Sequence, residues 1–385
     1  MRFRSVFSIP PPPWGLVELS SWQGKYILDT RDEKAYICDM KTPRTLQEAI
    51  VYFSDPDRCF EYACKLRWPD GKIICPRCSS DKHWFINSKT RKGAPRKLWL
   101  CRGCNKQFTL KVNTIFEDSA LGMDKWMTAF WMLVNCKNGV SSVEIGATLG
   151  ITQKSAWFML QRLRSALHNR TFGNTTKIGG PDSEVEVDET FIGGLTKNMH
   201  KGRKIRMVQQ GGIHGGKTIV QGLLDRNLRQ VRATVVPDVK RETLQNEILK
   251  NVKYGTKVYT DEATAYDNGM QRRFVHDVIN HSEAYVRGQV HTNGLENFWS
   301  LLKRGLRGTY VAVEPFHLFR YVDEQVFRYN NRNDGDQKVS PAERFARAMS
   351  QVAGRRLTYA ELTGKDGSPR HVPMGTGETP QDVPF

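Results

Sequence analysis

Two Cys-x-x-Cys pairs constrain this chain more than any other feature of its sequence. Cys75 pairs with Cys78 and Cys101 with Cys104, and 22 residues separate the two pairs. A Cys-x-x-Cys turn directs two thiolates at one point, and two such turns supply the four sulfur ligands that Zn²⁺ prefers in tetrahedral sites. The pattern predicts a zinc ribbon over residues 72–110 with these four ligands. Two disulfides or two pairs of buried thiols are the alternatives.

The chain carries a large excess of positive charge. Its 385 residues include 58 Lys and Arg against 40 Asp and Glu, which gives a formal net charge of +18. Such an excess causes self-repulsion, and a polyanionic partner such as nucleic acid relieves it. A generally basic surface is the alternative. The length predicts a multidomain protein of about two to three domains.

Nothing in the sequence indicates a membrane protein or a secreted one. Apolar runs fall short of the roughly 18 residues that a membrane span needs. The N-terminal apolar stretch is interrupted by prolines at 10–13 and is too short for a signal peptide. Cysteines in zinc spacing suit a reducing compartment, so a cytoplasmic location is expected.

The two ends of the chain differ in composition from the rest. Thr45 and Glu48 form a capping-box pattern shortly after Met40, which predicts a helix start. We therefore expect residues 1–39 to be an accessory or misassigned extension and residues 40–71 to be a helical lead-in. Residues 351–385 contain few large apolar side chains, which predicts a mobile tail.

The segment between the two cysteine pairs is basic. Strands are expected at residues 82–87 and 97–100, and no acid follows Asp81 before Cys101. A loop that contacts DNA phosphates is the preferred interpretation, and a solvated basic loop is the alternative. The basic residues are Lys89, Arg91, Lys92, Arg96 and Lys97.

Residues 117–172 have the pattern of a helix-turn-helix in a three-helix region. Ser141 and Glu144 form a capping box before a short helix, which ends at Gly150, and Thr152 begins a second helix with apolar residues at helical spacing. Its first turn, which would reach base edges, contains Gln153, Lys154 and Ser155. Lys154, Arg162 and Arg164 favour DNA binding, whereas three packed helices without that role are the alternative.

Residues 181–345 read as one α/β domain, after a Gly-rich connector at 173–181. Strands precede and alternate with helices over this length, as in an α/β fold. Strands are expected at 184–192, 208–213, 218–224, 231–236 and 257–261, and helices at 241–252, 294–304 and 315–329.

Three acids in this domain are candidate metal ligands. Asp188 and Asp261 are expected at strand ends, and Glu296 on a helix. Carboxylates from separate segments can converge on Mg²⁺ or Mn²⁺, and two such ions about 4 Å apart support phosphodiester chemistry. The alternatives are a solvated Asp188 and helix-capping roles for Asp261 and Glu296.

The helix that carries Glu296 is amphipathic. Glu296, Ser300 and Lys303 share one face. An apolar stripe lies beside them, made of Leu295, Phe298, Trp299 and Leu302. Packing by this stripe would direct Glu296 and Lys303 toward one site, where Lys303, with Arg304 beside it, is expected to contact DNA.

Four runs of the sequence resemble the catalytic motifs of ISXO-like insertion-sequence transposases. They span residues 187–194, 258–266, 291–304 and 321–332, and the resemblance covers about residues 40–345. It implies a zinc ribbon, a helix-turn-helix region and an RNase H-like DDE domain over 181–345. It also implies Asp188, Asp261 and Glu296 as the ligands of two Mg²⁺ or Mn²⁺ ions. Asn293 is a rival for the third position, because some relatives have Asn there.

The resemblance implies a DDE transposase of a bacterial insertion sequence. Such an enzyme binds the terminal inverted repeats of its element and target DNA, cleaves and transfers strands, acts as a homodimer or higher oligomer, and associates with the nucleoid. A domesticated or inactive DNA-binding regulator is one alternative, although all three acids are intact. A nuclease without strand transfer is the other.

Overall fold

The computed structural model describes residues 42–89, 95–168, 177–193, 217–261, 274–279 and 293–365. The chain divides into two units, residues 1–42 and 43–385, and the fold described below belongs to the second. Several expectations fall outside the described residues: the extension at 1–39, Arg91 and Lys92, the strand at 208–213, and residues 366–385. Among the described residues, none of the helices has the length and apolar character needed to cross a membrane.

Two short helices precede the ribbon. In α1 (Leu46–Phe53), the Thr45 side chain accepts a hydrogen bond from the Glu48 backbone N–H, which confirms the predicted helix start. The Glu48 carboxylate accepts from the Arg44 N–H rather than completing the box at Thr45. Helix α2 (Pro56–Arg67) begins with an Asp55 cap and a proline at its first position, both favoured there.

The ribbon is an antiparallel sheet of β1 (His83–Lys89), β2 (Pro95–Cys101) and β3 (Gln107–Phe108). Trp99 is its central side chain and is 2% exposed. Its ring stacks on Phe108 and on Phe60 of α2, both with ring centroids 5.5 Å apart. The stacking of Trp99 on the half-buried Phe60 joins the ribbon to α2.

Three helices follow: α3 (Met123–Asn135), α4 (Ser142–Leu149) and α5 (Gln153–Leu167). The predicted capping box at the start of α4 is present, with Ser141 and Glu144 each accepting from the other's backbone N–H. Gly150 has φ +60°, a left-handed conformation that ends α4 without steric cost. Thr152 caps α5 as predicted.

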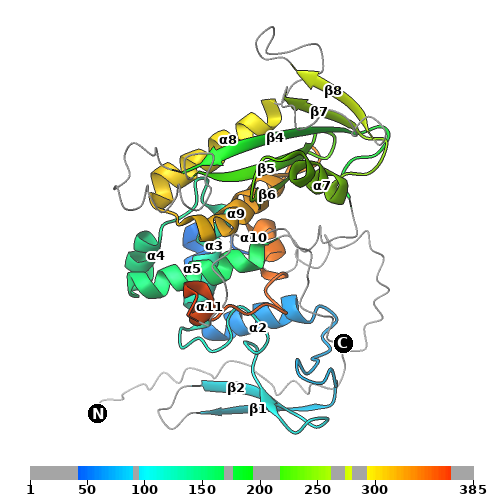
Figure 1. Cartoon of the computed structure of the whole chain (residues 1–385). Helices are drawn as coiled ribbons and strands as arrows, with labels where there is room; N and C mark the ends of the chain where they lie inside the picture. Colours follow the sequence, from blue (N-terminus) through cyan, green and yellow to red (C-terminus); the bar gives the residue numbers. More distant parts are fainter. Residues whose placement is uncertain are drawn as a thin grey trace, which may run out of the picture. The chain divides into compact units, whose positions relative to one another are not determined.

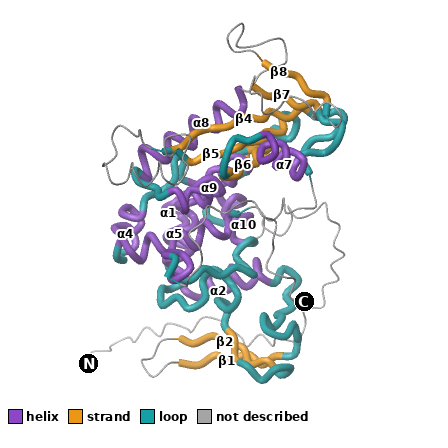
Figure 2. The backbone as a smooth tube through the Cα atoms, in the orientation of Figure 1, coloured by secondary structure: helices purple, strands orange, loops and turns teal. Residues whose placement is uncertain are grey.

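Five of the described strands form the sheet of the second half of the chain (Figure 2). The strand order is β6-β5-β4-β7-β8, where β4 is antiparallel to β5 and parallel to β7. The strands are β4 (Glu184–Ile192), β5 (Thr218–Asp225), β6 (Gln230–Val236), β7 (Lys257–Asp261) and β8 (Val275–Ile279). The predicted strands at 184–192, 218–224, 231–236 and 257–261 are therefore confirmed.

Helices cover both faces of this sheet (Figure 1). One apolar cluster joins Val185 and Val187 of β4 to α7 (Arg241–Asn251). A second joins β5 and β6 to α8 (Asn293–Gly305) and α9 (Leu318–Asn330). Because side chains alternate along a strand, the even-numbered residues of β4 face α8. The short elements between α8 and α10 are Leu306–Tyr310, Pro315–His317, β9 (Asn333–Asp334) and β10 (Gln337–Lys338).

The last described helices pack against the first ones. Phe345 of α10 (Pro341–Met349) is fully buried, with ring centroids 5.2 Å from Phe53 and 5.3 Å from Trp131. Helix α11 (Tyr359–Thr363) has a capping box of Thr358 and Glu361, and Leu362 is 1% exposed. The tail predicted to be mobile from residue 351 is thus folded as far as 365, because a few well-spaced apolar residues suffice to anchor it.

Candidate functional site

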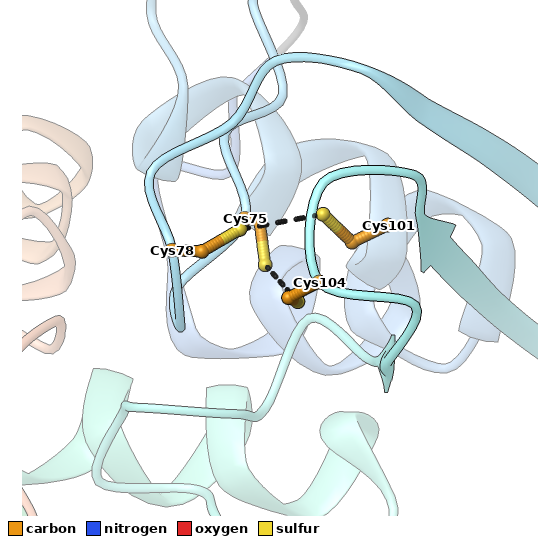
Figure 3. A group of neighbouring side chains, drawn as sticks. All are labelled: Cys75, Cys78, Cys101 and Cys104. Atoms are coloured by element: carbon orange, nitrogen blue, oxygen red, sulfur yellow. Dashed lines mark hydrogen bonds between the residues drawn. The ribbon is translucent and has the colours of Figure 1, made fainter.

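The four predicted zinc ligands lie together at the end of the ribbon (Figure 3). Their sulfur atoms all lie within 4.8 Å of one another. The Sγ–Sγ distances are 3.5 Å for Cys78–Cys101 and 3.9 Å for Cys75–Cys104, far beyond the ~2.05 Å of a disulfide. The two-disulfide alternative is therefore wrong.

The backbone and the thiols of this cluster favour metal binding. The residue after each Cys-x-x-Cys pair is left-handed, with φ +59° at Ser79 and +52° at Asn105, which turns each pair back on itself. The Cys104 backbone N–H is the main cause that lowers the pKa of Cys101 to about 6. The Ser80 backbone lowers the pKa of Cys78, but its hydrogen bond to Cys101, burial and the other thiols together raise it to about 12. The two thiols share a hydrogen bond that favours the thiolate form of Cys101, and four soft sulfur donors fit Zn²⁺.

Arg96 and Lys97, the two ribbon residues predicted to contact DNA, have different surroundings. Arg96 is exposed, with its guanidinium 3.4 Å from Gln107 Oε1. Lys97 Nζ lies 2.7 Å from Asp57 and 4.6 Å from the Phe60 ring centroid, both on α2. Lys97 therefore joins the ribbon to α2, and Arg96 is the better placed of the two to meet a phosphate.

The first turn of α5 is exposed at all three predicted positions. Gln153 Nε2 donates to Ser142 Oγ at 2.8 Å, and Lys154 Nζ lies 5.1 Å from the Tyr359 ring centroid. The Ser155 N–H donates to Thr152. This turn presents an amide, an ammonium and a hydroxyl to solvent.

The expectation that Arg162 and Arg164 support DNA binding was wrong. They are 4% and 1% exposed. Arg162 donates to the Glu117 carbonyl, and Arg164 Nε lies 2.6 Å from Glu324 Oε2 on α9. Helical spacing alone could not reveal partners so distant in the sequence.

Glu324 is the centre of a buried ionic network that the sequence patterns did not predict. It is fully buried and accepts from Arg164, Arg328 and the Tyr310 hydroxyl. The Arg164 guanidinium also lies 4.0 Å from the Tyr321 ring centroid. Burial raises the pKa of Glu324, but Arg328 and Arg164 outweigh it and hold that pKa below its ordinary value. Only the i, i+4 spacing of Glu324 and Arg328 hinted at part of this network.

Asp188 lies in the middle of β4 rather than at a strand end, because β4 continues to Ile192 paired with β5. Its Oδ1 accepts from the Glu189 backbone N–H at 2.8 Å, and its Oδ2 accepts from Trp299 Nε1 at 2.9 Å. Trp299 belongs to α8, so the helix meets this acid directly.

Asp261 ends β7 as predicted, although its side chain lies outside the described residues. The parallel pairing of β4 with β7 sets Glu186 opposite Tyr259. Two residues further along both strands are positions 188 and 261. Positions 188 and 261 therefore occupy corresponding places just beyond the last residues paired between the two strands.

Glu296 lies in the first turn of α8 and is exposed. The predicted apolar stripe of this helix is buried, with 0–4% exposure at Leu295, Phe298, Trp299 and Leu302. Lys303 is half-buried and Arg304 is exposed. Asn293, the rival third ligand, is the first residue of α8 and is also exposed.

A second acid of β4 also reaches α8, and no sequence pattern indicated it. Glu186 is 1% exposed and its Oε2 accepts from the Leu295 backbone N–H at 3.0 Å. Arg226 Nε lies 2.8 Å from the same carboxylate, and its NH1 lies 3.0 Å from Glu184. Glu186 thus binds the N-terminus of α8 to β4.

Comparisons with known proteins agree with this architecture. The ISXO2-like transposase domain matches residues 178–330, and the transposase zinc-ribbon domain matches residues 54–107. The chain therefore carries a transposase-type zinc ribbon followed by a transposase domain. More narrowly, these two domains are of the kind found in the ISXO2-like insertion-sequence transposases that its motifs resemble.

A relative from a mobile element supports the same assignment. The chain is 24% identical, over 266 residues, to a Halobacterium salinarum protein described as "Uncharacterized protein in transposable element ISH50". The match covers 67% of this chain and 85% of that one. The zinc-ribbon match begins at residue 54, so it includes α2, in keeping with the packing of α2 on Trp99.

Proposed function

We propose that this chain is a metal-dependent DDE transposase whose sheet domain is RNase H-like. The observation that carries the proposal is the Trp299–Asp188 hydrogen bond, which joins α8 to the middle of β4. The parallel pairing of β4 with β7, whose last residue is Asp261, supports it. Glu296 lies one turn before Trp299 on the same helix. The domain is thus proposed to gather its three acids beside β4 and β7, on the face of the sheet that α8 covers.

These acids would hold two Mg²⁺ or Mn²⁺ ions, for which hard carboxylate oxygens are suitable donors. When bound, such ions activate an attacking oxygen and stabilise a leaving oxygen in phosphodiester displacement. From the family resemblance, Asp188 would be a ligand of both ions, Asp261 of one and Glu296 of the other. Lys303, two turns beyond Glu296, would bind a DNA phosphate.

DNA recognition is proposed to fall to the ribbon and to α4–α5 acting as a helix-turn-helix. The exposed first turn of α5 would read the terminal inverted repeats through Gln153, Lys154 and Ser155. Arg96 would contact phosphate. Strand transfer into target DNA, a homodimer or higher oligomer in the DNA complex, and a cytoplasmic, nucleoid-associated location complete the proposal.

Asp188→Asn is expected to abolish cleavage of element ends while leaving end binding nearly unchanged. The amide removes a charged ligand but keeps the shape of the side chain, and Asp261→Asn and Glu296→Gln should behave alike. The measurement combines the chain, DNA carrying the element's ends and Mg²⁺, with products mapped at nucleotide resolution. Glu189→Gln, on the neighbouring residue of β4, is the matched control and should cleave normally.

Two outcomes would contradict this assignment. Normal cleavage by Asp188→Asn would exclude it as a ligand, and loss of DNA binding by all three variants would make the acids structural. Cleavage without joining to a target duplex would favour a nuclease instead.

Binding to element ends is expected to weaken steeply with salt. Neutralising several phosphates gives a slope of several units in a plot of log affinity against log salt concentration. Arg96→Ala should lower that slope by about one, because a phosphate contact is lost. Lys97→Ala should leave it nearly unchanged, since Lys97 pairs with Asp57. Fluorescence anisotropy over a salt series measures both, and a flat dependence would overturn the DNA-binding proposal.

A further inference from the structure

The indole of Trp299 connects α8 to the candidate metal-binding strand. The side chain is 4% exposed, and its Nε1–H donates to Asp188 Oδ2 at 2.9 Å. Each carboxylate oxygen has two acceptor positions, so this single bond does not saturate Oδ2. The contact therefore orients the carboxylate without consuming its capacity to bind metal.

A glycine on the neighbouring strand makes room for this indole. Gly222 of β5 is paired with Asp188 across the sheet. A Cβ at Gly222 would lie 2.6 and 2.8 Å from two ring carbons of Trp299 and 3.0 Å from Leu295. Only glycine accommodates so close an approach without movement. The indole thus lies against the backbone of β5 beside the acid.

A second contact determines where α8 lies along β4. The Leu295 N–H donates to Glu186. Leu295 lies one helical turn before Trp299 on α8, and Glu186 lies two residues before Asp188 on β4. A Cβ at Gly294 would lie 2.2 Å from Leu224 Cδ2 and 2.9 Å from the same Glu186 carboxylate, so a side chain here would displace both. The Leu295–Glu186 and Trp299–Asp188 hydrogen bonds together fix the position of α8 along β4.

We propose that Trp299 is a positioning residue that holds the Asp188 carboxylate in its metal-binding orientation. A hydrogen bond from a neighbouring group orients a ligating side chain, and its loss typically lowers metal affinity about 10–100-fold. Through α8, the same contact ties the position of Glu296 to that of Asp188. The inference rests on the proposed function, since it requires Asp188 to bind a divalent cation.

The test is Mn²⁺ affinity of the full-length, zinc-loaded chain, measured from free Mn²⁺ by electron paramagnetic resonance. Trp299→Phe keeps an aromatic ring over Gly222 but removes the N–H, and it should weaken Mn²⁺ binding about 10-fold or more. The matched control is Trp126→Phe, because Trp126 is equally buried and donates to a side-chain oxygen, Ser119 Oγ, at 3.0 Å. That control should bind Mn²⁺ as the parent chain does.

A second replacement separates the hydrogen bond from packing. Benzothienylalanine at position 299 keeps the shape of the indole and replaces only its N–H by sulfur, so it should reproduce the loss of affinity. If the benzothienyl variant binds Mn²⁺ as the parent chain does while Asp188→Asn has lost Mn²⁺ binding, the proposed role of Trp299 is overturned and the metal site is not. Unchanged binding by Asp188→Asn would overturn the proposed metal site, and the inference with it.

Discussion

Chelation of zinc is expected to unfold the ribbon. The sheet β1–β3 is small, and its four cysteines lie where the two Cys-x-x-Cys turns come together. Since the metal site does not exist in the unfolded chain, its binding free energy, about 10–16 kcal/mol at pH 7 in small zinc domains, serves as folding free energy. Elemental analysis should find one zinc per chain. Protease cleavage within residues 72–110 should follow addition of a strong chelator.

Single cysteine replacements give the matched comparison. Cys75→Ser should lose zinc and expose the ribbon to protease, because three thiolates do not close the tetrahedral set. Cys136→Ser should keep one zinc, since Cys136 ends α3, outside the four-cysteine cluster. Full zinc occupancy in Cys75→Ser, or none in the parent chain, would contradict the site. The transposase domain should stay folded, because its two apolar clusters contain no cysteine of this group.

Features that depend on neighbours in the sequence could be predicted from the sequence. The cysteine pairs, the caps at Thr45, Ser141 and Thr152, and the buried stripe of α8 all involve residues only a few positions apart. Their chemistry is local, so spacing and residue type are enough. The same holds for Asp261 at the end of β7, because the strand pattern stops there.

Features that depend on distant partners could not be predicted. Arg164 looked like a DNA-binding residue of α5, but its partner Glu324 is 160 positions away. The Trp299–Asp188 bond joins residues 111 positions apart. Phe345 packs against Phe53, which lies near the start of the described fold. Periodicity shows which side of a helix is apolar, but not which other segment covers it or which buried charge meets it.

Replacing Glu324 is expected to destabilise the packing of α5 on α9 strongly. Glu324→Gln keeps the size of the side chain but leaves Arg164 and Arg328 buried without a counter-charge. Breaking a buried ion pair by removing one partner typically costs about 3–5 kcal/mol in the free energy of unfolding. Urea unfolding of the zinc-loaded chain, followed by circular dichroism, measures the change. Asp323→Asn is the matched control on the same helix, where its partner His168 is largely exposed, and it should cost at most about 1 kcal/mol.

A double-mutant cycle separates the network from the individual charges. If Glu324→Gln destabilises the chain because it leaves guanidinium groups buried without a counter-charge, adding Arg164→Met should recover part of the lost stability. The coupling free energy between the two substitutions should then exceed about 0.5 kcal/mol. Additive losses would show that Glu324 is held mainly by Arg328 on its own helix. A Glu324→Gln chain within 1 kcal/mol of the parent would contradict the network altogether. Because α5 meets α9 through this pair, the coupling also measures how firmly the candidate DNA-reading helix is joined to the transposase domain.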